Sequence, residues 1–277
     1  MYELRHITSL DDPQLQPYRT MRRQEDHRRL GLFVAEGEKI VRRLVESSME
    51  MVSVVMPPHW VDTYGPLLAA RPEHIPVYVA ELSVLDELTG FNLYQGVLAL
   101  GRVPQIPSLP ALFETSQRPS LFVAIDGVSS AENVGVLMRT AAAFGATGFL
   151  KGESSASPFL RRAVRGSMGA VLRLPVAELT DLKASLLWLR EQGVNCIAAH
   201  PHAENQILTN VDLTRDVCVI LGSEGEGISP AVLEACSISI AIPMAHDVDS
   251  LNVAMAGTAF LYEAARQRRA LVSLPGR

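Results

Sequence analysis

Short apolar runs alternate with longer amphipathic segments in the second half of the chain. The runs are rich in Val, Ile and Leu, as in strands buried on both faces. They read LFVAID from residue 121, VNCIAAH from 194, VCVILG from 217 and ISIAIP from 238. Segments with helical spacing of apolar residues lie between them, and a last one runs from about residue 250 to 268. This alternation predicts an α/β fold with a parallel sheet, in which ligands bind at the carboxyl ends of the strands.

The first hundred residues predict a second, smaller α/β domain. LFVAEGEKIVRRLVES, from residue 32, is typical of a strand, a glycine turn and a helix, and VSVVMP, IPVYVAE and QGVLALG are typical of strands. Four prolines then interrupt the chain at Pro104, Pro107, Pro110 and Pro119. We therefore expect a first domain over residues 1–105, a proline-rich linker over 106–119 and a second domain over 120–277.

Composition narrows the class of protein. A chain of 277 residues with 48% hydrophobic content is long enough for two cores and is not disordered. Cys196, Cys218 and Cys236 are about twenty residues apart, which fits neither a zinc pair nor a disulfide framework, so we expect no metal and a reducing compartment. No run approaches the roughly 18 apolar residues that span a bilayer. We expect a cytoplasmic protein without membrane contact.

Basic side chains gather in two places although the formal net charge is −5. The first group lies at Arg22, Arg23, Arg28 and Arg29, and the second at Arg161, Arg162 and Arg165. The planar guanidinium suits bidentate contacts with phosphate, so both groups are candidate phosphate-binding surfaces. A solvated helical face is the alternative for each.

Three polar clusters follow predicted strands of the second half. In the first, Asn133 lies at a strand-to-helix turn and Arg139 on the first or second turn of the helix. An arginine in that position opposes the helix macrodipole at a cost of about 0.3–1 kcal/mol, which suggests that it has a role. An ion pair with Glu132 or with another carboxylate is the structural alternative.

The other two clusters are a glycine-rich loop and a helix start. The loop LGSEGEGIS carries Glu224 and Glu226 and lacks the endings of phosphate-binding loops, so it favours a ligand with hydroxyls or positive charge. The third cluster places Ser250 as N-cap of the last helix and Asn252 in its first turn. The alternative for the loop is a structural turn that binds no ligand, and the alternative for the third cluster is a helix cap with no other role.

The three clusters taken in order resemble a known set of motifs. NVGxxxRTAxxFG, LGSEGEGIS and IPMxxxxxSLNVAxA are similar to the signature motifs of the SpoU–TrmH family of SPOUT RNA ribose 2′-O-methyltransferases, over roughly residues 121 to 269. The N-terminal FVAEGEKIVRRLVES resembles the family's substrate-binding domain, which is like ribosomal protein L30e. Two departures are SSAEN before the first motif, where Asp-Pro-x-Asn is common, and Ala254, where serine is common.

The resemblance implies a cofactor and a fold. S-adenosylmethionine would be held in a deep trefoil knot of the C-terminal domain, an exception to the rule that chains avoid threading. The implied cofactor-binding residues are Ala199, His200, Gly222, Ile242, Met244 and Leu251.

The resemblance also implies a catalytic set and partners. The set is Asn133, Arg139, Glu224, Ser250 and Asn252. A guanidinium is a poor base near neutral pH, so we expect Arg139 to position the target rather than to accept its proton. The family is generally homodimeric and needs no metal, and the two arginine groups would contact RNA.

The predicted function is methylation of a ribose 2′-hydroxyl in structured RNA, with 23S-type rRNA favoured. Two alternatives stay open: a tRNA 2′-O-methyltransferase, and an inactive RNA-binding or ribosome-assembly protein of the same fold. A serine hydrolase is disfavoured because no G-x-S-x-G elbow is present.

Overall fold

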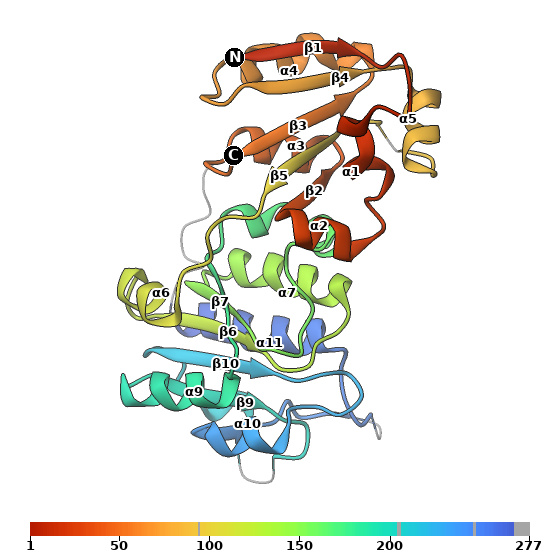
Figure 1. Ribbon diagram of the computed structural model, residues 1–277. Helices are drawn as coiled ribbons and strands as arrows, with labels where there is room; N and C mark the ends of the chain where they lie inside the picture. The colour runs from red at the N-terminus through yellow and green to blue at the C-terminus, as the bar shows by residue number, and fades with distance from the viewer. Residues whose placement is uncertain (94, 204–205, 246–247, 269–277) are drawn as a thin grey trace. The chain divides into compact units, whose positions relative to one another are not determined.

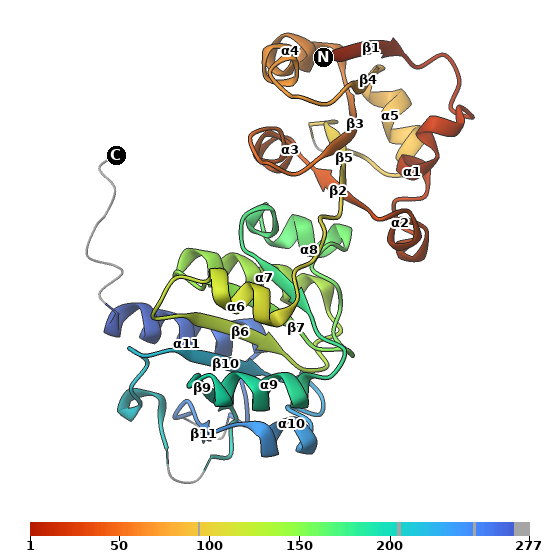
Figure 2. The same ribbon diagram turned by 60° about the vertical axis from the view of Figure 1, so that its left-hand side comes forward.

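A computed structural model describes residues 1–93, 95–203, 206–245 and 248–268. The chain divides into two compact units. The first comprises residues 1–105 together with 159–172, and the second comprises residues 106–158 together with 173–277, as far as these are described. Figures 1 and 2 show the elements of each unit from two directions.

The first unit is built on a five-stranded mixed sheet of order β1-β4-β3-β5-β2. Its parallel pairs are β1 with β4 and β3 with β4, and its antiparallel pairs are β2 with β5 and β3 with β5. The small α/β domain expected here is thus present. Its elements are β1 (Tyr2–His6), η1 (Pro13–Leu15), α1 (Gln16–Arg19), α2 (Gln24–Leu30), β2 (Leu32–Glu36), α3 (Glu38–Val45), β3 (Met51–Met56), η2 (Pro58–Trp60), α4 (Val61–Ala69), β4 (Ile75–Val79), α5 (Leu82–Thr89), β5 (Leu98–Arg102), α8 (Arg161–Gly166) and η3 (Ala170–Leu172).

The second unit contains a six-stranded sheet of order β11-β9-β10-β6-β7-β8, and every strand pair in it is parallel. The parallel sheet predicted from the continuous apolar runs is confirmed. The elements are α6 (Leu109–Thr115), β6 (Leu121–Ile125), α7 (Ala131–Ala143), β7 (Gly148–Lys151), β8 (Val176–Glu178), α9 (Leu182–Glu191), β9 (Asn195–Ala199), η4 (Leu208–Asn210), β10 (Val217–Leu221), α10 (Pro230–Ala235), β11 (Ile238–Ile240) and α11 (Val253–Gln267).

Helices cover both faces of this second sheet (Figure 2). On one face α6, α9 and α10 bury Leu112, Leu186 and Val232 against strand residues such as Phe122. On the other face α7 and α11 pack closely at Gly257, where an added Cβ would lie 2.4 Å from the Leu137 side chain and 2.9 Å from Leu221. Gly257 of α11 thus lies close both to α7 and to Leu221, the last residue of β10.

Two segments differ from the expected division of the chain. The segment expected to be a linker contains α6, because Ser108 caps it at the hydroxyl and Leu109, Leu112 and Phe113 are buried. Residues 159–172, expected in the C-terminal domain, belong to the first unit. There α8 lies against β2, and Phe159 packs on Phe33 with ring centroids 5.8 Å apart.

Two helix starts also differ from the sequence prediction. The hydroxyl of Ser130 accepts a hydrogen bond from the Asn133 amide, so α7 begins at Ala131 and Arg139 lies on its third turn rather than its first or second. The macrodipole argument for Arg139 is therefore wrong, since that effect is confined to the first turn. The N-cap of α11 is Asn252, whose side chain accepts from the Ala254 amide, and not Ser250.

Candidate active site

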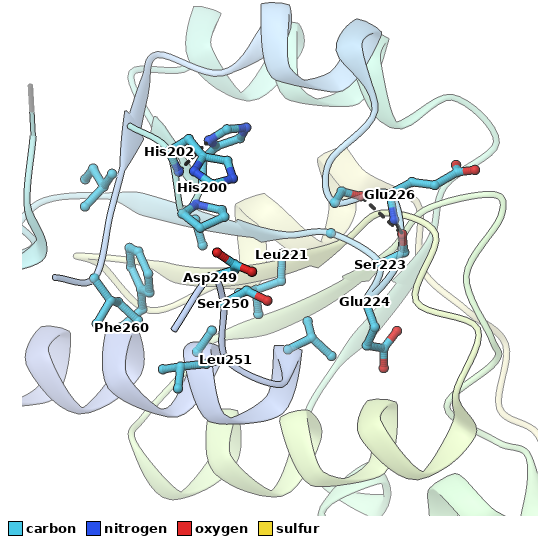
Figure 3. A pocket seen from close by; sticks show the side chains of 18 of the residues that line it. His200, His202, Leu221, Ser223, Glu224, Glu226, Asp249, Ser250, Leu251 and Phe260 are labelled. Atoms are coloured by element: carbon cyan, nitrogen blue, oxygen red, sulfur yellow. Dashed lines mark hydrogen bonds between the residues drawn. The ribbon is translucent and has the colours of Figure 1, made fainter. Parts of the chain in front are cut away.

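A cavity of about 290 Å³ lies at the carboxyl ends of the central strands in the second unit. Its wall comes from the segments that follow β9, β10 and β11 and from the start of α11. Figure 3 shows these segments around the cavity, with Phe260 at one end and Glu224 at the other. The volume is close to the lower limit for pockets that bind small molecules.

All the cofactor-binding candidates line this cavity. They are Ala199, His200, Gly222, Ile242, Met244 and Leu251. Several of the remaining lining residues are apolar, namely Leu221, Ile240, Val253, Ala256 and Phe260. The cavity thus combines an apolar wall with the exposed backbone of a glycine-rich loop, which suits a planar, partly polar ligand.

The glycine-rich loop forms a tight turn directly after β10. The Ser223 amide donates to the Gly227 carbonyl at 2.9 Å, and the Gly227 amide donates back to the Ser223 carbonyl at 3.1 Å. Gly227 has φ of +72°, which favours glycine. At Gly222 an added Cβ would lie 2.1 Å from the Gly227 carbonyl carbon, so only glycine fits there. These constraints explain why the sequence needs glycine at both positions.

One hydrogen-bonded chain joins the three sequence motifs. The Asn252 side-chain amide donates to Asn133 Oδ1 at 3.3 Å, and the side-chain amide of Asn133 donates to Glu224 Oε1. Asn252 Oδ1 meanwhile accepts from the Ala254 amide at 2.9 Å. Residues 91 and 119 positions apart in the chain are thereby held in one arrangement. This chain fixes the Glu224 side of the cavity relative to α7 and α11.

The five candidate catalytic residues do not all reach the cavity. Ser250 and Glu224 line it. Asn133 is linked to the cavity by its hydrogen bond to Glu224, and Asn252 is linked to it by its hydrogen bond to Asn133. Arg139 is exposed and forms no hydrogen bond or ion pair with the residues that the structure describes. The alternative of an ion pair between Arg139 and Glu132 is not observed. Asn133 and Arg139, six residues apart on α7, point about 120° apart around the helix.

Asp126 is a functional candidate that the sequence analysis missed. Its side chain is 8% exposed and accepts a hydrogen bond from the Ser229 amide at 2.8 Å, beyond the glycine-rich loop. Its own amide donates to the Leu221 carbonyl at 2.9 Å. Asp126 therefore braces both ends of the loop. The sequence feature that could have identified Asp126 is its position as an acidic residue directly at the end of the apolar run LFVAID.

The arginine candidates for RNA binding lie in the first unit and are partly engaged. Glu36, at the end of β2, receives hydrogen bonds from Arg161 at 2.5 Å and from Arg165 at 3.1 Å. Arg22 donates to the Gly90 carbonyl at 3.0 Å and lies 4.9 Å from the Phe91 ring. The side chains of Arg23, Arg28, Arg29 and Arg162 are exposed. The second arginine group is thus not a purely solvated face, because an acid 125 residues away pairs with it.

The three cysteines are free thiols that pack in or against the hydrophobic core of the second unit. Burial raises the pKa of Cys236 to about 12 and also raises the pKa of Cys218 well above its ordinary value, so both thiols stay protonated near neutral pH. In the described ranges, no group of three or more His, Cys, Asp or Glu side chains is suited to a metal ion. Among the helices of the described residues, none has both the length and the apolar character of a membrane span.

Comparison with known proteins places the chain among RNA-modifying enzymes. A family model described as the SpoU rRNA Methylase family matches residues 120–262. An uncharacterized tRNA/rRNA methyltransferase of Mycobacterium tuberculosis is 30% identical over 273 residues, covering 95% of this chain and 92% of that protein. A second, from Synechocystis, is 30% identical over 276 residues, covering 99% of this chain and 98% of the relative.

Solved structures agree over nearly the whole chain. The AdoMet-bound rRNA methyltransferase of Sinorhizobium meliloti superposes with a TM-score of 0.83 at 26% identity, covering 98% of this chain and 99% of that one. A structure described as an RNA 2′-O ribose methyltransferase gives a TM-score of 0.76 at 25% identity and covers 96% of this chain and 100% of the other. The family match spans the cavity and all three motifs, and the chain therefore belongs to the SpoU rRNA methylase family.

Proposed function

We propose that this protein methylates a ribose 2′-hydroxyl of structured RNA with S-adenosylmethionine as methyl donor, and that the RNA is ribosomal. One observation carries the proposal: the Asn252–Asn133–Glu224 chain joins three distant motifs at the edge of a cavity that the cofactor candidates line. Family membership and relatives named as tRNA/rRNA methyltransferases support the same conclusion.

The cavity fits the proposed donor in shape and chemistry. Apolar side chains such as Ile242 and Leu251 suit the adenine ring, and the missing Cβ of Gly222 lets the glycine-rich loop fold tightly onto its own backbone at Gly227 beside the cavity. The described lining includes the carboxylate of Asp249 and holds no lysine or arginine, which suits a cationic donor better than a pyrophosphate. The Sinorhizobium relative, solved with AdoMet bound, supports this assignment.

Arg139 is proposed to hold the RNA at the reacting hydroxyl. When bound, S-adenosylmethionine supplies a methyl group on a sulfonium, which is already an activated leaving group. The unpaired guanidinium of Arg139 binds the phosphate next to the target ribose, orients the 2′-hydroxyl and stabilises the negative charge that develops on its oxygen. The hydroxyl proton passes to a phosphate or to water. Glu224 and Asn252 position the loops and do not exchange protons.

A homodimer is proposed to complete the site. Arg139 does not line the cavity of its own chain, and an exposed apolar face lies beside it. Ala142, Ala143 and Gly145 near the end of α7 are exposed, as are Met255 and Tyr262 on α11. Phe144 and Tyr262 join the two helices with ring centroids 5.9 Å apart. We expect a second copy to cover this face, and light scattering that shows a monomer at micromolar concentration would contradict it.

The C-terminal trefoil knot and the L30e-like first domain also belong to the proposal. The segments after β9 and β11 are joined by backbone hydrogen bonds, from Ala241 to Gln206 at 2.9 Å and from Leu208 to Ala241 at 3.0 Å, and we propose that these segments form part of the knot. The mixed sheet of the first unit and its exposed arginines support an RNA-binding role. A two-domain arrangement of this kind favours large-subunit rRNA over tRNA.

Methyl transfer from labelled S-adenosylmethionine to total rRNA and total tRNA tests the proposal. We expect label in rRNA at a ribose 2′-oxygen, with site mapping in cells that have or lack the protein to identify the nucleotide. Label only in tRNA would identify the protein as a tRNA 2′-O-methyltransferase instead. Binding of RNA without any transfer would identify an inactive adaptor instead.

Arg139→Ala separates positioning from cofactor binding. We expect transfer to fall by at least about a hundredfold, because the phosphate contact and the charge stabilisation are both lost. The dissociation constant for S-adenosylmethionine, measured by calorimetry, should stay within about twofold, since Arg139 does not line the cavity. Near-normal turnover of the variant would reject the proposed role, and Arg215→Ala, at a side chain 87% exposed, serves as the matched control.

A further inference from the structure

Three carboxylates of the described residues line the cavity, and one of these three is directed into it. Figure 3 shows Glu224 pointing toward α7, where its carboxylate accepts the hydrogen bond from Asn133. Glu226 extends away from the cavity in the same view. The carboxylate of Asp249 lies in the middle, between the end marked by Phe260 and the end marked by Glu224.

Asp249 has no partner of its own in the described part of the chain. It forms neither a hydrogen bond nor an ion pair there. Asp249 is exposed, and the cavity that it lines has both apolar side chains, such as Leu221 and Leu251, and polar ones, such as His200. A ligand that fills the cavity would displace water from this carboxylate and strengthen its interaction with any positive charge in the ligand.

The position of Asp249 along the cavity suggests which part of a ligand it meets. The end near Phe260 suits a ring system, and the end near Glu224 adjoins the hydrogen-bonded series Asn252–Asn133–Glu224. A carboxylate midway between them faces the centre of the ligand. In S-adenosylmethionine the atom that links the nucleoside to the reacting methyl group is the positively charged sulfur.

We propose that Asp249 is a specificity residue that distinguishes the sulfonium donor from the thioether product by charge. The inference rests on the proposed function. Transfer of the methyl group to the ribose oxygen leaves the sulfur neutral, with the bonding pair of the S–CH₃ bond retained on sulfur. The attraction to Asp249 is then lost, so the same carboxylate that retains the donor weakens the hold on the product.

Asp249→Asn tests this directly by calorimetry with two probes, S-adenosylmethionine and S-adenosylhomocysteine. Both carry the same amino-acid and nucleoside groups, and they differ in the methyl group and the positive charge on sulfur. We expect the dissociation constant for the donor to rise roughly three- to tenfold, with a change of less than about twofold for the product. Unchanged product binding also shows that the variant is folded.

Glu226→Gln is the matched control, because it removes a carboxylate of the same cavity that is directed away from it. We expect this variant to bind both probes as the unmodified protein does. An equal loss for donor and product in Asp249→Asn, or no loss for either, would overturn the inference while leaving the proposed function intact. Failure of the unmodified protein to bind either probe would overturn both.

Discussion

At the level of single residues, backbone clearance decides the shape of the cavity. Gly222 and Gly225 belong to the same loop and both line the cavity. A Cβ on Gly222 would collide with the backbone of Gly227 and Ile228 at 2.1 and 2.3 Å, whereas nothing lies within 4 Å of a Cβ on Gly225. The two glycines therefore have different reasons to be present, although they look equivalent in the sequence.

This difference predicts opposite outcomes for two alanine substitutions. Gly222→Ala should destabilise the second unit by about 1–3 kcal/mol, because the loop must open to admit the methyl group. It should also weaken S-adenosylmethionine binding at least tenfold. Gly225→Ala should change neither the unfolding free energy nor the affinity appreciably. Urea unfolding and calorimetry on both variants check the pair, and equal behaviour would show that the backbone contact is unimportant.

At the level of elements, Asp216 ties the start of β10 to the start of β6. Its Oδ1 accepts from the Ser120 amide at 2.6 Å and from the Ser120 hydroxyl at 2.9 Å, and Arg118 pairs with Oδ2 at 2.5 Å. Burial raises the pKa of this carboxyl, but the hydrogen bonds from Ser120 and the pairing with Arg118 outweigh burial and lower the pKa below its ordinary value of 3.8. The ionised form thus stabilises the junction of the two central strands.

The lowered pKa predicts a pH-dependent contribution to stability. A carboxyl whose pKa is depressed on folding stabilises the protein above the unfolded pKa, and this contribution is lost as the pH falls through the folded pKa. Asp216→Asn should therefore be less stable than the unmodified protein at pH 7. The difference should shrink as the pH drops below about 3.8.

Urea midpoints between pH 7 and pH 3 measure this effect. Glu191→Gln, at an exposed carboxylate at the end of α9, is the control and should show no such convergence. A stability difference for Asp216→Asn that is independent of pH would mean that shape, and not charge, holds the junction.

At the level of the whole molecule, the chain leaves the first unit and returns to it. Residues 159–172 interrupt the second unit and pack with the first, where Phe159 meets Phe33 and Glu36 holds Arg161 and Arg165. Val164 and Val171 are buried in this segment. The C-terminal half carries the whole cavity, but its residues 159–172 depend on the first unit for their packing partners.

A fragment of residues 106–277 should therefore be locally unstable. Without β2, the apolar side chains of residues 159–172 lose their partner, and we expect trypsin to cleave at Arg161, Arg162 or Arg165 at least tenfold faster than in the full chain. Cleavage after Lys183 and Arg190 on α9 should be unchanged, because α9 packs within the second unit. Mass spectrometry of a digestion time course measures both rates. Equal protection of residues 159–172 in fragment and full chain would contradict the assignment of this segment.

The order of apolar and polar residues along the chain by itself determined the parallel sheet and the approximate position of the candidate site. Continuous apolar runs predicted the parallel sheet, because strands covered on both faces have no polar side to show. The ends of those runs indicated where Gly222, Glu224 and Asn252 would gather, because parallel strands place their carboxyl ends at one edge. Family resemblance added the cofactor candidates, and these line a single cavity.

Only the tertiary structure decided the features that depend on residues far apart in the chain. Glu36 pairs with arginines 125 and 129 positions away, and Asn133 joins Glu224 across 91 positions, pairings that have no local sequence signal. The direction of Asp249 into the cavity likewise depends on how the neighbouring loops fold over it. Spacing along a chain determines the faces of strands and helices, but contacts between them depend on packing, which no single segment encodes.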